Sequence, residues 1–184
     1  MKRRSIIWVI ALTGMCFLSP PLKAQQVRNL SAPESFQEKL ESITTAYLDL
    51  EAQIRRGNAT KARTQANALI VYLDEMSKAQ LEGEKRADWM SSRLKLLKLL
   101  NEIDNAPDIL DQRGVFNDLS HTLAETLKRF GPVRMNLYAF SCSDALRQGG
   151  YWIDSERSSV NPYDPDKPDC GDLREQIVSY KNQK

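Results

Sequence analysis

The sequence predicts an all-α fold: an up-down four-helix bundle over residues 25–131, with an irregular C-terminal cap and a short final helix over residues 132–184. Four segments carry apolar residues at alternating three- and four-residue spacing, which is typical of helices that bury one face. Helix start and stop signals separate these segments. Proline, glycine and aromatic residues concentrate after residue 131, where the helical periodicity ends. We expect the cap to pack on the bundle within the same domain.

Residues 1–24 are typical of a cleavable signal peptide. Lys2, Arg3 and Arg4 precede an apolar run at 5–18 that is too short for a membrane span, and Ala24 suits cleavage. This segment holds four of the 26 basic residues and none of the 24 acidic ones, so the mature chain has a net charge of −2. We therefore expect a periplasmic protein with no membrane span after cleavage. A clustered basic face for nucleic acid is missing.

The first two helices are predicted to form an antiparallel pair. Ser31 and Glu34 form a capping box before the first helix, and Pro33 suits its first turn. Gly57 ends this helix and Asn58 caps the next, so the connection is tight. The first apolar stripe is Phe36, Leu40, Ile43, Tyr47, Leu50 and Ile54. The second stripe is Ala62, Ala66, Leu69, Leu73 and Met76.

The third and fourth helices complete the predicted bundle. The third is expected over residues 85–103, after a polar break around Gly83. Pro107 and Asp108 are start signals for the fourth helix, and Gly131 with Pro132 ends it. The main stripe of the third helix is Trp89, Leu96, Leu100 and Ile103. The stripe of the fourth is Ile109, Gln112, Phe116, Leu119, Leu123, Leu127 and Phe130.

The last part of the chain has a different pattern. Apolar residues alternate over 133–139, which favours an extended segment. Turn signals follow at 149–150, 161–162, 164–165 and 167–168. Asp172 suits the cap of a short final helix, whose apolar residues are Leu173, Ile177 and Tyr180.

From the sequence we expect that the protein is not an enzyme. It has no phosphate-binding glycine loop, no zinc-protease motif and no nucleophile elbow. His121 is the single histidine, and its phase places it on the outer face of the fourth helix. We interpret it as a solvated surface residue, with a lone metal ligand as the alternative. Its outward phase also argues against a catalytic pair with Cys142 or Cys170.

Several motifs resemble those of the DUF3347 family of exported bacterial proteins. The C-terminal motifs are Cys142-Ser-Asp144-Ala145, Gly150-Tyr151-Trp152, Asn161-Pro162-Tyr163 and Cys170-Gly171. Upstream, Gln112, Arg113, Phe116 and Tyr47 also fit the family. Its members occur alone and fused to the periplasmic adaptors of copper and silver efflux pumps. The resemblance therefore implies copper or silver handling, with an efflux or envelope protein as partner.

The chain departs from this family at the expected metal ligands. Ser143 and Asp144 follow the first cysteine where the family has Pro-Met, and Pro168 stands where it has a methionine before Cys-Gly. Thioethers and thiolates are the soft ligands that select Cu(I) and Ag(I), so the expected site has lost both methionines. The remaining methionines of the mature chain, Met76, Met90 and Met135, do not sit at matching positions.

Three states of Cys142 and Cys170 remain open. A disulfide suits an oxidising compartment, since Cys16 leaves with the signal peptide and two cysteines remain. Alternatively, the two thiolates bind Cu(I) or Ag(I), with Asp144 or His121 as a further ligand, or both stay free thiols. We favour the disulfide.

The other motif residues have a structural interpretation. We expect Trp152 to pack on the end of the bundle and the Asn161 side chain to cap a turn. The remaining structural motif residues are Gln112, Arg113, Tyr151, Pro162, Tyr163 and Gly171. Two functions follow as hypotheses. One is an exported, non-catalytic accessory or binding protein for copper or silver; the other is a structural or protein-interaction module with a Cys142–Cys170 disulfide and no metal.

Overall fold

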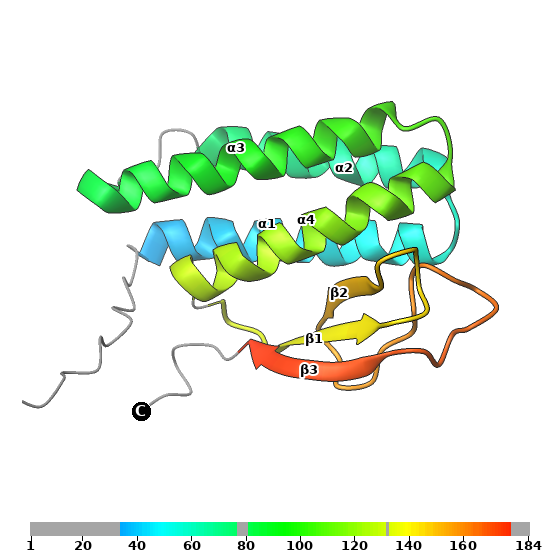
Figure 1. The fold of residues 1–184 in the computed structure, drawn as a ribbon. Helices are drawn as coiled ribbons and strands as arrows, with labels where there is room; N and C mark the ends of the chain where they lie inside the picture. Colours follow the sequence, from blue (N-terminus) through cyan, green and yellow to red (C-terminus); the bar gives the residue numbers. More distant parts are fainter. Residues whose placement is uncertain (1–33, 77–80, 132, 178–184) are drawn as a thin grey trace, which may run out of the picture.

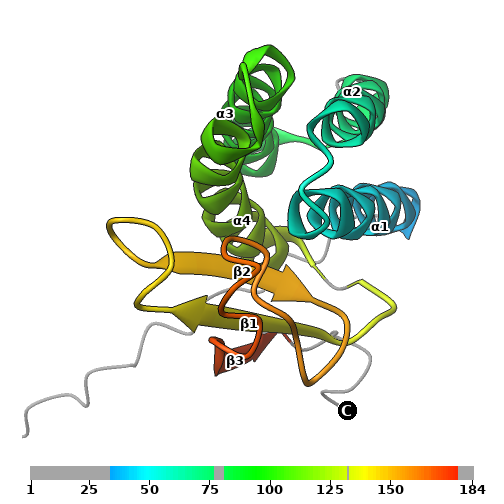
Figure 2. The ribbon, with the colours of Figure 1, turned by 90° about the vertical axis from the view of Figure 1, so that its right-hand side faces the viewer.

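The computed structural model describes residues 34–76, 81–131 and 133–177. Its first four elements are helices, as predicted: α1 (Glu34–Arg55), α2 (Ala59–Glu75), α3 (Gly83–Asn105) and α4 (Ile109–Phe130). Successive helices run antiparallel and pack side by side, with the helices seen end-on in Figure 2. The predicted signal peptide and the capping residue Ser31 lie outside the described residues.

The all-α prediction is wrong, because the C-terminal region forms a three-stranded antiparallel sheet. Its strands are β1 (Leu137–Cys142), β2 (Gly150–Asp154) and β3 (Asp172–Ile177), in the order β2-β1-β3. Cys142 pairs with Gly150 at one end of the β1–β2 hairpin. The fold is therefore a helical bundle with a sheet attached, and the cap is not irregular (Figure 1).

The predicted final helix is an edge strand. Leu173 and Ile177 have the spacing of a helix face, but in the structure Leu173 is 42% exposed while Ile177 is buried. β3 pairs along β1, with a register shift at Ala139/Phe140. Backbone pairing with an open strand edge outweighs a weak helical pattern in so short a segment.

The helix boundaries follow from local chemistry. Gly57 has φ +69°, a left-handed conformation that glycine adopts at little cost, and its N–H donates to Ile54. The Asn58 side chain accepts from the backbone N–H of Lys61, and Asp108 accepts from those of Leu110 and Asp111. These caps satisfy N–H groups that have no partner within the helix.

The core is built from the predicted stripes of all four helices. Every residue of the α1 and α2 stripes is buried. At one end of the bundle, the rings of Phe36, Trp89 and Phe130 pack together with mostly edge-on geometry. Among the described residues, no helix is both long and apolar enough to cross a bilayer.

One hydroxyl group links the sheet to two helices. Ile153 of β2 donates its N–H to the hydroxyl of Tyr47 in α1, at 3.1 Å. The same hydroxyl lies 2.7 Å from the Ser120 hydroxyl in α4. The sheet is thereby positioned against α1 and α4, with β2 nearest α4 (Figure 2).

Candidate functional site

Cys142 and Cys170 form a disulfide across 28 residues of sequence. Cys142 is the buried last residue of β1, and Cys170 lies two residues before β3. The bond therefore ties the end of β1 to the start of the edge strand. Of the three states considered from the sequence, the disulfide is the one in the structure.

The loop enclosed by this disulfide is fixed by Asn161. Its side-chain oxygen accepts from the N–H of Tyr163, its amide nitrogen donates to Lys167, and its own N–H donates to Pro168. Asn161 is only 2% exposed, and Pro162 beside it is buried. These contacts give the Asn-Pro-Tyr motif a structural role.

The aromatic motif residues pack where two glycines make room. A Cβ on Gly150 would lie 2.5 Å from the Tyr163 ring, and a Cβ on Gly171 would lie 2.9 Å from the Trp152 ring. Trp152 is fully buried and stacks on Phe140. It contacts the sheet and the Asn161 loop, so it holds the cap together.

Gln112 and Arg113 join the helices at one end of the bundle. The Gln112 amide donates to the carbonyls of Ala59 in α2 and Ile103 in α3. Arg113 donates to the carbonyl of Ile54 near the end of α1. Burial lowers the pKa of the Arg113 guanidinium, against an opposing effect of Asp164. Both side chains bind helix-end carbonyls and serve the fold.

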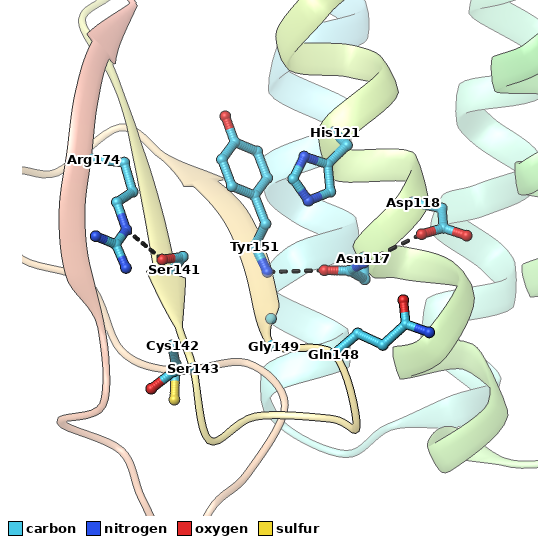
Figure 3. Close-up of a pocket in the computed structure, with 11 residues that line it drawn as sticks. Asn117, Asp118, His121, Ser141, Cys142, Ser143, Gln148, Gly149, Tyr151 and Arg174 are labelled. Atoms are coloured by element: carbon cyan, nitrogen blue, oxygen red, sulfur yellow. Dashed lines mark hydrogen bonds between the residues drawn. The ribbon is translucent and has the colours of Figure 1, made fainter.

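A polar pocket of about 590 Å³ opens where α4 meets the sheet, and we call it the α4–sheet pocket (Figure 3). Three of its residues come from α4, namely Asn117, Asp118 and His121. The end of β1, the β1–β2 turn, the start of β2 and Arg174 of β3 supply the rest. A volume of this size suits a small-molecule ligand.

Hydrogen bonds hold the walls of this pocket. Asn117 accepts from the N–H of Tyr151 at 2.9 Å and donates to Asp118 at 3.2 Å. On the other side, Arg174 donates from Nε to the Ser141 hydroxyl. The first bond fixes α4 to β2, and the second fixes β3 to β1.

His121 is exposed, as its phase predicted, but it has a partner. Its ring stacks on that of Tyr151, with centroids 4.0 Å apart and planes 13° apart. Partial burial lowers the pKa of His121, although Asp118 and Glu125 oppose this shift. The ring is therefore mostly neutral near pH 7. The Cys142 sulfur points away from His121 in Figure 3, so the two form no catalytic pair.

The donor groups do not fit a Cu(I) or Ag(I) site. Both cysteine sulfurs are bonded to each other and carry no thiolate charge. Met76 is fully buried in the core, and Met90 and Met135 are partly buried and pack against this core. Within the described ranges, no three His, Cys, Asp or Glu side chains come close enough to hold a metal ion.

Most of the pocket residues were not candidate site residues in the sequence. Asn117, Asp118 and Gln148 carry no motif, and Arg174 was assigned to a helix. For Asn117 and Asp118 a signal existed, because they share the outer surface of α4 with His121. The sheet covers part of this surface in the structure, and the sequence does not indicate this contact.

Comparison with known proteins gives one match. A family model described as "Protein of unknown function (DUF3347)" matches residues 43–135, which cover most of α1 and all of α2, α3 and α4. The α4 wall of the pocket lies inside this match and the sheet lies beyond it. No curated protein and no solved structure matches the chain.

Proposed function

The chain belongs to the DUF3347 family of proteins of unknown function, and we propose that it is an exported, non-catalytic binding module that recognises a ligand in the α4–sheet pocket. The polar pocket at the helix–sheet junction is the observation that carries this proposal. The disulfide beside the pocket suits an oxidising compartment, in agreement with the signal-like residues 1–24.

The chemistry of the pocket favours binding over catalysis. The Ser141 hydroxyl accepts from Arg174, the Ser143 hydroxyl donates to Asp144, and the Cys142 sulfur is in the disulfide. A nucleophile needs an adjacent base, and His121 is stacked on Tyr151 instead. Recognition by hydrogen bonds is what this arrangement supports.

The disulfide argues against the copper or silver handling that the family resemblance implies. A soft-metal site would need the thiolates of Cys142 and Cys170, which the disulfide removes. The proposed ligand is therefore an organic molecule that binds the oxidised protein.

The first test uses protein exported to the periplasm under native conditions. Mass-based thiol counting and metal analysis on one sample should give two blocked cysteines and no bound copper or silver. Freely labelled cysteines, or stoichiometric Cu(I) that is lost in Cys142→Ser, would contradict the proposal.

The second test is a screen of polar fragments by two-dimensional NMR on the same oxidised protein. We expect hits that shift signals of His121 and Tyr151 and that are recovered chemically unchanged. Gln148→Trp should block the pocket and abolish these shifts, while Glu156→Trp, outside the pocket lining, should preserve them. Chemical conversion of a hit, or shifts that survive Gln148→Trp, would overturn the proposal.

A further inference from the structure

The α4–sheet pocket has one cationic and one anionic side chain on opposite sides. Arg174 comes from β3 and Asp118 comes from α4, and the turn and β2 residues lie between them (Figure 3). The two charges cancel, so the pocket favours neither a simple anion nor a simple cation. A ligand with separated opposite charges would match both walls.

Arg174 is fixed and still available to a ligand. Its Nε is engaged by Ser141, which limits the rotation of the guanidinium group. Its Nη2 lies 3.6 Å from Asp172, whose side chain is 81% exposed. An ion pair this exposed contributes little, so a carboxylate in the pocket can compete for the guanidinium. Bidentate binding of a carboxylate is the geometry that guanidinium groups favour.

Asp118 is held in place by a neighbour that also forms the wall. Asn117 donates to one oxygen of Asp118 while it accepts from Tyr151. The second carboxylate oxygen has no hydrogen-bond partner among the described residues. An ammonium group of a ligand could therefore bind there.

The surface between the two charges is polar but uncharged. It includes the Gln148 amide, which has no hydrogen-bond partner within the described ranges, and the stacked rings of His121 and Tyr151. An amide can donate and accept at once, as a peptide bond does. This surface suits the backbone of a short peptide.

From this arrangement we infer that the α4–sheet pocket binds a short peptide with free termini, its carboxylate on Arg174 and its ammonium on Asp118. The inference rests on the proposed binding function and specifies its ligand class. It also assigns Arg174 and Asp118 as the residues that determine specificity.

The test is calorimetric titration of the exported, oxidised protein with four forms of trialanine: free, N-acetylated, C-amidated and blocked at both ends. The free form should bind, and each block should weaken binding about tenfold or more, as loss of a charge-assisted hydrogen bond implies. Arg174→Gln should weaken the free form about tenfold and leave the C-amidated form unchanged. Asp118→Asn should weaken the free form likewise and leave the N-acetylated form unchanged.

Arg157→Gln and Asp49→Asn are matched controls, since both residues are exposed and outside the pocket lining. Equal binding of the free and doubly blocked forms would overturn the inference, as would loss of both free and C-amidated binding in Arg174→Gln. If the fragment screen finds pocket ligands but no trialanine form binds, the peptide assignment fails and the binding module stands. If neither binds, both proposals fail.

Discussion

Tyr47 joins three elements through one hydroxyl group, and the direction of each hydrogen bond can be assigned. Ser120 donates to the carbonyl of Phe116 at 2.8 Å, so its proton is engaged. Tyr47 must therefore donate to Ser120 and accept from Ile153. All three groups are buried, and each has a partner. Burial raises the pKa of Tyr47 far above its usual value, although the hydrogen bonds with Ser120 and Ile153 oppose this shift, so the phenol stays protonated.

Tyr47→Phe should destabilise the protein by about 1–3 kcal/mol, because it leaves the buried Ile153 N–H without a partner. Urea denaturation would measure the change. Tyr72→Phe is the control, since Tyr72 is 40% exposed on α2, and it should change stability by less than about 0.5 kcal/mol. Equal stability of Tyr47→Phe and the natural protein would show that the hydrogen bond does not hold the sheet.

Glu51 is a buried carboxyl group with incomplete pairing. It is 3% exposed, and its Oε1 has no hydrogen bond although Arg55 Nε lies 3.7 Å away. Burial raises the pKa of Glu51 to about 7; Arg55 and Arg56 lower it and Asp154 raises it further. The folded protein therefore binds a proton at Glu51 at pH values where the unfolded chain has released it.

This difference predicts a stability that falls as pH rises from about 4.5 to 7, by up to about 3 kcal/mol, since the unfolded state binds fewer protons over that range. Urea midpoints at pH 5, 6, 7 and 8 would measure it, and Glu51→Gln should flatten this part of the profile. His121 contributes with the opposite sign, because its pKa is lowered in the folded state. The difference between Glu51→Gln and the natural protein isolates Glu51. An unchanged profile in Glu51→Gln would contradict this assignment.

At the scale of elements, the helices could be predicted because their signals are local. An apolar stripe, a capping side chain and a glycine stop lie within one segment, and the structure keeps them together in α1, α2 and α4. The sheet could not be predicted in the same way. Pairing of β3 with β1 joins residues more than 30 positions apart, and nothing in Asp172–Ile177 itself specifies that partner.

The α4–sheet pocket could not be predicted from the sequence for the same reason. Its cation lies on β3 and its anion on α4, and their proximity depends on the order β2-β1-β3. The disulfide, by contrast, was the favoured state of the cysteines, because it needed only two cysteines and an oxidising compartment. The pairing of the two cysteines could be inferred from their chemistry, whereas the position of the pocket residues depends on the fold.

Two glycines in different elements give a paired prediction. Gly114 lies inside α4, and an added Cβ there would have nothing within 4 Å, so Gly114→Ala should stabilise by about 0.5–1 kcal/mol. Gly150→Ala in β2 should destabilise by about 1–3 kcal/mol, because its Cβ would overlap the Tyr163 ring. Thermal or urea denaturation would compare the two. A stable Gly150→Ala variant would show that the Tyr163 loop can move at little cost.

At the scale of the whole molecule, the bundle and the sheet depend on different forces. Apolar stripes hold the helices, whereas the sheet also relies on the disulfide. Replacing both Cys142 and Cys170 with serine should lower stability by about 3–4 kcal/mol, as the chain-entropy model gives for a loop of 28 residues. Denaturation followed by circular dichroism would measure the loss. The helical signal before the transition should be unchanged, and a loss of that signal would mean that the bundle needs the cap to fold.

The disulfide also determines what a protease could do to the molecule. Residues 155–158 and 165–169 are exposed and lie within the segment that Cys142 and Cys170 enclose. A single cut there would leave two polypeptides joined by a covalent bond, with β3 still attached to β1. The nicked protein would run as one species until a reductant separates it into two fragments. Cleavage in either exposed segment would thus leave Arg174 connected to the rest of the α4–sheet pocket.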